Sequence, residues 1–182
     1  MTPLCGCGNR IDTHHHIIPP AYLARARNQV VSDAPALAKA VLEWNAARAV
    51  EALDRAGIAT AITSISSPGI FFGDRDTTRA LSRECNDFAA GLKQDHPGRF
   101  GQFATLPLPD VDASLREVEY ALDILRAEGI GLVTNVGGLY PGDPAFTPVF
   151  DELNRRGATV YFHPTAAHGC ANLLPGIQPA TL

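Results

Sequence analysis

Three histidines in two distant segments of the chain have the spacing of metal ligands. His14 and His16 alternate in the segment RIDTHHH (residues 10–16), and His163 stands in the segment ATVYFHP (residues 158–164). Side chains alternate faces along a β-strand, so His14 and His16 would project from the same face, about 7 Å apart. Imidazole nitrogens are common ligands of zinc and other divalent ions. The sequence therefore predicts a metal site that contains His14, His16 and His163.

The predicted position of these histidines in the fold supports this interpretation. Each segment carries its histidines at the C-terminal end of an expected strand, and ligands bind at that edge in parallel β/α folds. Asp12 would share a face with His14, one layer deeper, where it could orient a ligand or simply fill the interior. His15 would point the other way, and we expect it to be a packing residue.

Strand and helix patterns alternate along the chain and predict an α/β fold. Apolar runs typical of parallel strands covered by helices follow the first strand at residues 58–65, 100–108, 130–136 and 159–162. Amphipathic helical patterns lie between them at residues 45–56, 76–93, 114–129 and 144–157. We expect Asp76 to cap the second of these helices, and Ser114 with Glu117 to form a capping box at the third. The order predicts βαβ units with right-handed crossovers.

Composition narrows the possible functions. The chain has 182 residues, 46% of them hydrophobic, and a net charge of −4. This length suits a single domain over residues 1–182, and is below the roughly 250 residues of a complete eight-unit barrel. No basic block favours nucleic-acid binding, and no apolar run approaches the roughly 20 residues that span a bilayer. We expect a cytoplasmic protein, because no secretory signal is visible, with its four cysteines as free thiols.

Residues 17–44 form a long insertion after the first strand, with a short helix expected at residues 21–29. The insertion could line the site or be a surface feature without a role. Weaker candidates for substrate contact are Trp44, Asn135 and His168. A buried aromatic residue at a helix start is the alternative for Trp44, and loop hydrogen bonding is the alternative for Asn135.

The motifs resemble a known family. They are Asp12-x-His14-x-His16-x-x-Pro19, then Pro97-x-Arg99-Phe100 with Ala104 and Leu106-Pro107, and finally Phe162-His163-Pro164. Together they resemble the amidohydrolase-2 group of the amidohydrolase superfamily. Within that group the chain looks most like the metal-dependent decarboxylases of aminocarboxymuconate semialdehyde, 6-methylsalicylate and γ-resorcylate.

The resemblance implies a TIM-type (β/α)8 barrel, of which this chain holds the first five strands as an incomplete barrel. It implies a Zn²⁺ ion, or Mn²⁺ as the alternative, held by His14, His16 and His163. The implied reaction is decarboxylation of a small aromatic or unsaturated carboxylic acid. A hydrolase or lactonase of the same superfamily is the alternative, since such ligands also activate water.

The resemblance also implies residues at positions that lie beyond Leu182. The family adds an aspartate ligand after the eighth strand and a catalytic histidine after the sixth. A non-catalytic fragment that needs a complementary C-terminal half is therefore a further alternative to an enzyme.

The distance between the first and fifth strands decides whether five strands can form the metal site. A flat five-stranded sheet would hold its first and fifth strands about 19 Å apart, whereas metal–imidazole bonds measure about 2.0–2.1 Å. We therefore expect the metal site to depend on the curvature that the strands of a closed barrel enforce. Two outer strands with unpaired edges also predict self-association into a homo-oligomer.

Overall fold

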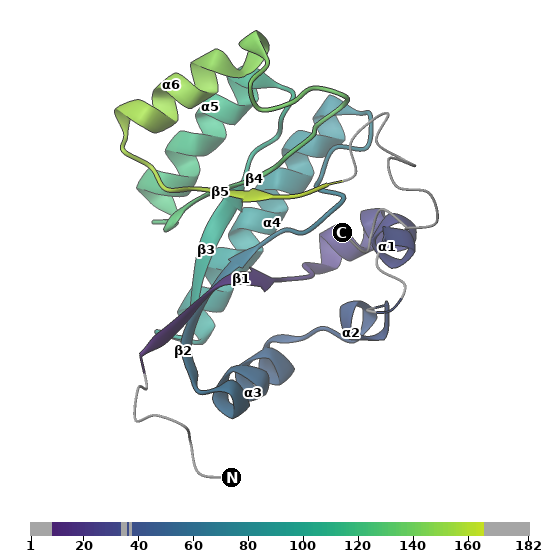
Figure 1. The fold of residues 1–182 in the computed structure, drawn as a ribbon, viewed down its shortest axis with the longest axis vertical. Helices are drawn as coiled ribbons and strands as arrows, with labels where there is room; N and C mark the ends of the chain where they lie inside the picture. Colours follow the sequence, from purple (N-terminus) through teal and green to yellow (C-terminus); the bar gives the residue numbers. More distant parts are fainter. Residues whose placement is uncertain (1–8, 34–35, 37, 166–182) are drawn as a thin grey trace, which may run out of the picture.

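The structure, a computed structural model, describes residues 9–33, 36 and 38–165. Within this part of the chain, five parallel strands pair in the order β1-β2-β3-β4-β5. The strands are β1 (Arg10–His16), β2 (Ile58–Ser64), β3 (Phe100–Thr105), β4 (Gly129–Val133) and β5 (Val160–His163). The sheet curls into a half-barrel, so that β5 passes close to β1 (Figure 1). The predicted incomplete barrel is confirmed.

Helices alternate with the strands, as the sequence predicted. They are α1 (Pro20–Asp33), α2 (Ala38–Leu42), α3 (Ala46–Ala56), α4 (Arg75–Asp95), α5 (Val111–Glu119) and α6 (Thr147–Arg155), together with the π-helical turn η2 (Tyr120–Ile124) and the 3₁₀ turn η3 (Pro144–Phe146). No helix in the described ranges is long and apolar enough to cross a membrane.

The helices cover one face of the sheet, and the three histidines project from the other face. Ile130 and Leu132 of β4 pack with α5 and α6, and Ala61 and Phe100 pack with α3 and α4. Burial of such apolar side chains is the main force that holds helices on a sheet. Side chains of the intervening positions therefore point into the half-barrel, where Phe103 stacks on Tyr161 with ring centroids 5.3 Å apart.

The expected caps of two helices are wrong. Asp74, not Asp76, caps α4 by accepting the N–H of Thr77, and Asp110 caps α5 by accepting the N–H of Ala113. Ser114 and Glu117 lie inside α5 and are buried. Several polar residues near each helix start can act as a cap, and the loops that deliver the chain to each helix decide between them.

The insertion at residues 17–44 is largely helical. Its first helix, α1, is longer than the predicted 21–29. Tyr22, Ala26 and Val30 of α1 form a buried cluster with Leu81 and Cys85 of α4. The insertion therefore contributes to the core beside α4.

Candidate metal centre

The three predicted ligands meet inside the half-barrel. Nε2 of His16 lies 3.0 Å from Nε2 of His14 and 3.1 Å from Nε2 of His163. All three histidines offer a ring nitrogen, and these atoms lie within 4.8 Å of one another. The expected dependence on further strands is wrong for this geometry, because the curl of five strands already brings β1 and β5 together.

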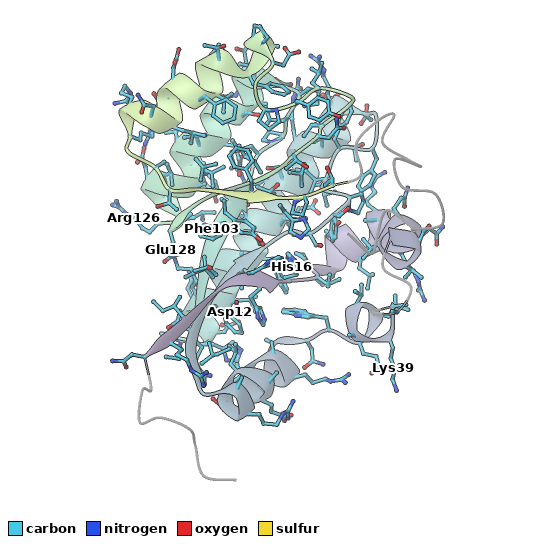
Figure 2. The ribbon with its side chains drawn as sticks, viewed as in Figure 1. Asp12, His16, Lys39, Phe103, Arg126 and Glu128 are labelled. Carbon is cyan, nitrogen blue, oxygen red and sulfur yellow. The ribbon has the colours of Figure 1, made fainter. Side chains whose placement is uncertain are left out.

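A bulge in β1 sets the direction of its histidines. Between Asp12 and His15 the chain advances three residues while its partner strand advances two, from Ala61 to Thr63. Such a bulge adds twist and re-aims side chains. Figure 2 shows Asp12 and His16 on the same short stretch of β1.

Asp12 supports this bulge. Its carboxylate accepts the backbone N–H of His14 at 3.0 Å and lies 3.2 Å from Nδ1 of His15. These contacts hold the backbone of a predicted ligand rather than its imidazole ring. His15 faces away from the other histidines and lies beside Phe100, with ring centroids 6.4 Å apart.

Hydrogen bonds at the far ring nitrogens leave the Nε2 atoms available. Nδ1 of His163 lies 2.7 Å from the carbonyl oxygen of Pro164, so it carries the proton and donates it to that oxygen. Nδ1 of His16 lies 3.4 Å from the Oγ atom of Ser64. Partners of this kind fix the tautomer of metal-binding histidines. The proton on Nδ1 of His163 leaves the lone pair of its Nε2 free on the side where His16 lies.

Burial favours the uncharged form of two of these rings. It lowers the pKa of His16 to about 4, with smaller contributions from the neighbouring His163 and His14. Burial also lowers the pKa of His163. Because a metal ion binds the neutral ring, a low pKa removes competition from protons.

The donor set fits a divalent ion. Tetrahedral bonds of about 2.0–2.1 Å place ligand nitrogens about 3.3 Å apart, close to the two Nε2 separations of 3.0 Å and 3.1 Å that His16 makes. No carboxylate belongs to this group among the described residues. Three protein ligands leave an open position of the kind that catalytic zinc sites use for water or substrate.

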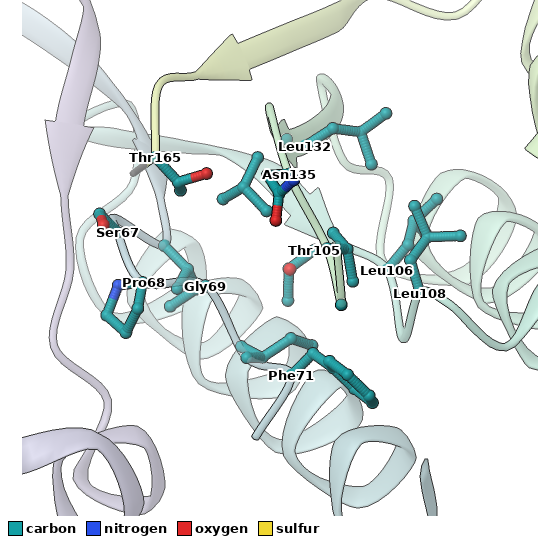
Figure 3. A pocket seen from close by; sticks show the side chains of 16 residues that line it. Ser67, Pro68, Gly69, Phe71, Thr105, Leu106, Leu108, Leu132, Asn135 and Thr165 are labelled. Atoms are coloured by element: carbon teal, nitrogen blue, oxygen red, sulfur yellow. The ribbon is translucent and has the colours of Figure 1, made fainter. Parts of the chain in front are cut away.

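A cavity of about 280 Å³ lies at the same edge of the sheet, and the three histidines are not among the described residues that line it (Figure 3). It lies among the ends of β2, β3 and β4, and Asn135 is one of its lining residues. The position of Asn135 agrees with the predicted substrate contact, which stays a prediction. Phe71 and Thr105, which the sequence analysis did not single out, also line the cavity.

Trp44 packs against the buried cluster of α3, β2 and α4, with its ring 6.0 Å from that of Phe88. It is not among the residues that line the cavity. Its predicted substrate contact stays a prediction. His168 lies outside the described residues. Ser64 was missed, although a polar residue at the end of a predicted strand was a usable signal.

Comparison with known proteins identifies the family. The model of the amidohydrolase family matches residues 11–181. The chain belongs to this family. It is 39% identical over 163 residues to the decarboxylase yanB of Aspergillus niger, covering 86% of this chain and 44% of the relative. It is 37% identical over 161 residues to the 6-methylsalicylic acid decarboxylase of Penicillium expansum, covering 86% of this chain and 48% of the relative.

Solved structures agree with the fold. An amidohydrolase II structure superposes with a TM-score of 0.81 at 31% identity, covering 94% of this chain and 55% of that one. A dihydroxybenzoic acid decarboxylase from Polaromonas sp. JS666, with bound manganese, gives a TM-score of 0.74 at 26% identity, covering 92% of this chain and 51% of that one. The chain thus spans about half the length of the relatives that it matches.

Proposed function

We propose that His14, His16 and His163 bind a divalent metal ion and that the protein is a metal-dependent decarboxylase of a small aromatic or unsaturated carboxylic acid. The convergence of the three Nε2 atoms at the C-terminal edge of the sheet carries this proposal. The decarboxylases among the relatives support the reaction class. Three neutral imidazoles suit Zn²⁺, whereas the manganese in the Polaromonas structure supports Mn²⁺ as the alternative.

The residues around the histidines would prepare the site for a carboxylic acid. A bound divalent ion would supply positive charge for the oxygens of the substrate. Phe103 and Tyr161 stack two residues before the strand ends and form an aromatic floor, which would exclude water from a bound substrate. Burial raises the pKa of Tyr161, so its hydroxyl keeps its proton at neutral pH. Exclusion of water strengthens the interaction between a carboxylate and a cation.

Metal binding can be tested on the chain itself. Stripped protein would be titrated with ZnCl₂ and with MnCl₂ by calorimetry, and the bound metal counted by elemental analysis. We expect one ion per chain for the wild type and loss of this binding for His16→Ala. His96→Ala is the matched control, since His96 lies at the end of α4 and contacts Phe100 instead. Equal binding by the His16→Ala variant would refute the site.

The reaction class needs a separate assay. Release of CO₂ from a panel of hydroxybenzoates by a full-length relative would be compared with hydrolysis of lactones by the same relative, because hydrolysis is the alternative activity. Decarboxylation that depends on added metal and on the histidine that aligns with His16 supports the proposal. Lactone turnover without CO₂ release would favour the hydrolase instead.

A further inference from the structure

Two of the three predicted ligands have a polar partner at Nδ1, and His14 does not. The partner of His16 is the Oγ atom of Ser64, and the partner of His163 is the carbonyl oxygen of Pro164. In the described part of the chain, the ring of His14 has only Nε2 of His16 within hydrogen-bond distance. His14 is also exposed, whereas the other two histidines are half-buried. Exposed side chains change rotamer readily, so the ring of His14 needs another contact to keep its orientation.

The ring of Tyr161 provides such a contact. It meets the ring of His14 edge to face, with centroids 5.6 Å apart and planes at 64°. Aromatic pairs favour this arrangement at centroid distances of about 4.5–7 Å. The other rings that His14 meets in the described residues are those of His16 and His163. Tyr161 lies two residues before His163 on β5, so both side chains point into the half-barrel, toward β1.

Tyr161 is itself held in place across β4. Its ring stacks on that of Phe103 of β3, with centroids 5.3 Å apart and planes at 10°. β4 lies between these two strands, and its Gly131 pairs with Tyr161. A Cβ atom at Gly131 would lie 3.3 Å from Cβ of Phe103, closer than the roughly 3.5–4.0 Å of an ordinary carbon–carbon contact. The absence of a side chain at Gly131 thus lets the two rings meet over β4.

We propose that Tyr161 is a positioning residue of the metal centre, whose ring is fixed by Phe103 and holds the imidazole of His14 in the orientation that binds the ion. The inference rests on the proposed function. The contact joins two rings, so the ring of Tyr161 is the part that His14 needs. A phenylalanine at this position should therefore serve as well as tyrosine, and a leucine should not.

The test compares three variants of the chain. Tyr161→Leu removes the ring, and Tyr161→Phe keeps it. Phe162→Leu is the matched control, because Phe162 is the next residue of β5 but stacks on Phe150 of α6 instead. Each metal-free protein would be titrated with ZnCl₂ by calorimetry. Urea unfolding of the same samples would show that each variant is folded and how much stability it has lost.

We expect Tyr161→Leu to weaken zinc binding about 10-fold, the lower end of the effect of removing a group that orients a metal ligand. Tyr161→Phe and Phe162→Leu should bind zinc as the wild type does. Both leucine variants lose an aromatic stack, so a fall in affinity in Tyr161→Leu alone separates positioning from a general loss of packing. Unchanged affinity in Tyr161→Leu would overturn the proposal, as would an equal fall in Phe162→Leu or in Tyr161→Phe.

A second measurement needs no metal. The ring of Tyr161 shifts the NMR signals of the ring protons of His14, so Tyr161→Leu should move these signals and Tyr161→Phe should not. Signals of His14 that do not respond to Tyr161→Leu would overturn the contact. A wild-type chain that binds no zinc would refute the metal site and the role of Tyr161 together. Zinc binding that is equal in the wild type and in Tyr161→Leu would refute the role of Tyr161 alone.

Discussion

Asn86 of α4 joins the helix layer to the end of β3. Its side chain is buried, and its Nδ2 donates to the carbonyl oxygen of Thr105 at 2.9 Å and to Oε1 of Glu117 at 2.8 Å. Its Oδ1 accepts the N–H of Thr105 at 2.8 Å. One amide thus connects the strand end that borders the cavity with Glu117 of α5.

Replacing Asn86 with alanine should be strongly destabilising. The carbonyl oxygen of Thr105 keeps the hydroxyl of Ser82, and Glu117 keeps its ion pair with Arg83. The Thr105 N–H is left without a partner, while the affected oxygen of Glu117 keeps Nε of Arg83 at 3.3 Å. A buried group without a partner costs about 1–3 kcal/mol and each of the two other lost hydrogen bonds about 1 kcal/mol, so we expect the free energy of unfolding to fall by about 3–4 kcal/mol. That is a large part of the roughly 5–15 kcal/mol that stabilises a typical domain.

Urea unfolding followed by circular dichroism would measure the loss. Ser82→Ala is the comparison, because it removes one hydrogen bond to an oxygen that Asn86 still satisfies, at a cost of about 1 kcal/mol. The midpoint should shift with little change in the slope, as for a change in stability alone. An Asn86→Ala variant no less stable than Ser82→Ala would show that the amide does not join these elements as described.

Three further predictions concern other parts of the chain. The pKa of Asp110 is lowered by the N–H of Ala113 and by the Arg79 guanidinium. The carboxylate therefore contributes to the free energy of unfolding above the unfolded pKa of 3.8, and this contribution is lost as the pH falls through the lower pKa of the folded state. Asp110→Asn should flatten this acid limb of a stability–pH curve from urea melts, and an unchanged curve would contradict it. Burial raises the pKa of Cys85 to about 12, so iodoacetamide at pH about 8 should modify Cys85 only after the protein unfolds. Peptide mass spectrometry would measure the modification, and rapid labelling of Cys85 in the native protein would contradict the prediction. The 182-residue chain alone should sediment as dimers or larger species, because Ile11 and Phe162 on the outer strands are 62% and 43% exposed. The same chain should release little CO₂, because no Asp or Glu follows Glu152 to supply the aspartate that the family resemblance implies. A monomer with substantial turnover would contradict both expectations.

Local sequence was enough to locate the strands and the three candidate ligands. Apolar runs predict covered parallel strands because each such residue must be buried on one face or the other, and all five strands lie at or within a few residues of their predicted positions. His14, His16 and His163 could be selected because each lies at a strand end. A strand end faces the ligand-binding edge whatever the remaining packing is.

Tertiary structure decided how these residues meet. Twist accumulates from strand to strand, so the sheet curls and places Nε2 of His16 and His163 3.1 Å apart, where a flat sheet would leave about 19 Å between their strands. The accumulated twist of five strands cannot be predicted from the sequence pattern of any one strand. The same holds for Trp44, which packs against Phe88, and for Asn135, which lines the cavity and whose buried Nδ2 has no hydrogen-bond partner among the described residues. Whether a polar or aromatic side chain is paired or buried depends on neighbours that are distant in sequence, and only the folded arrangement supplies them.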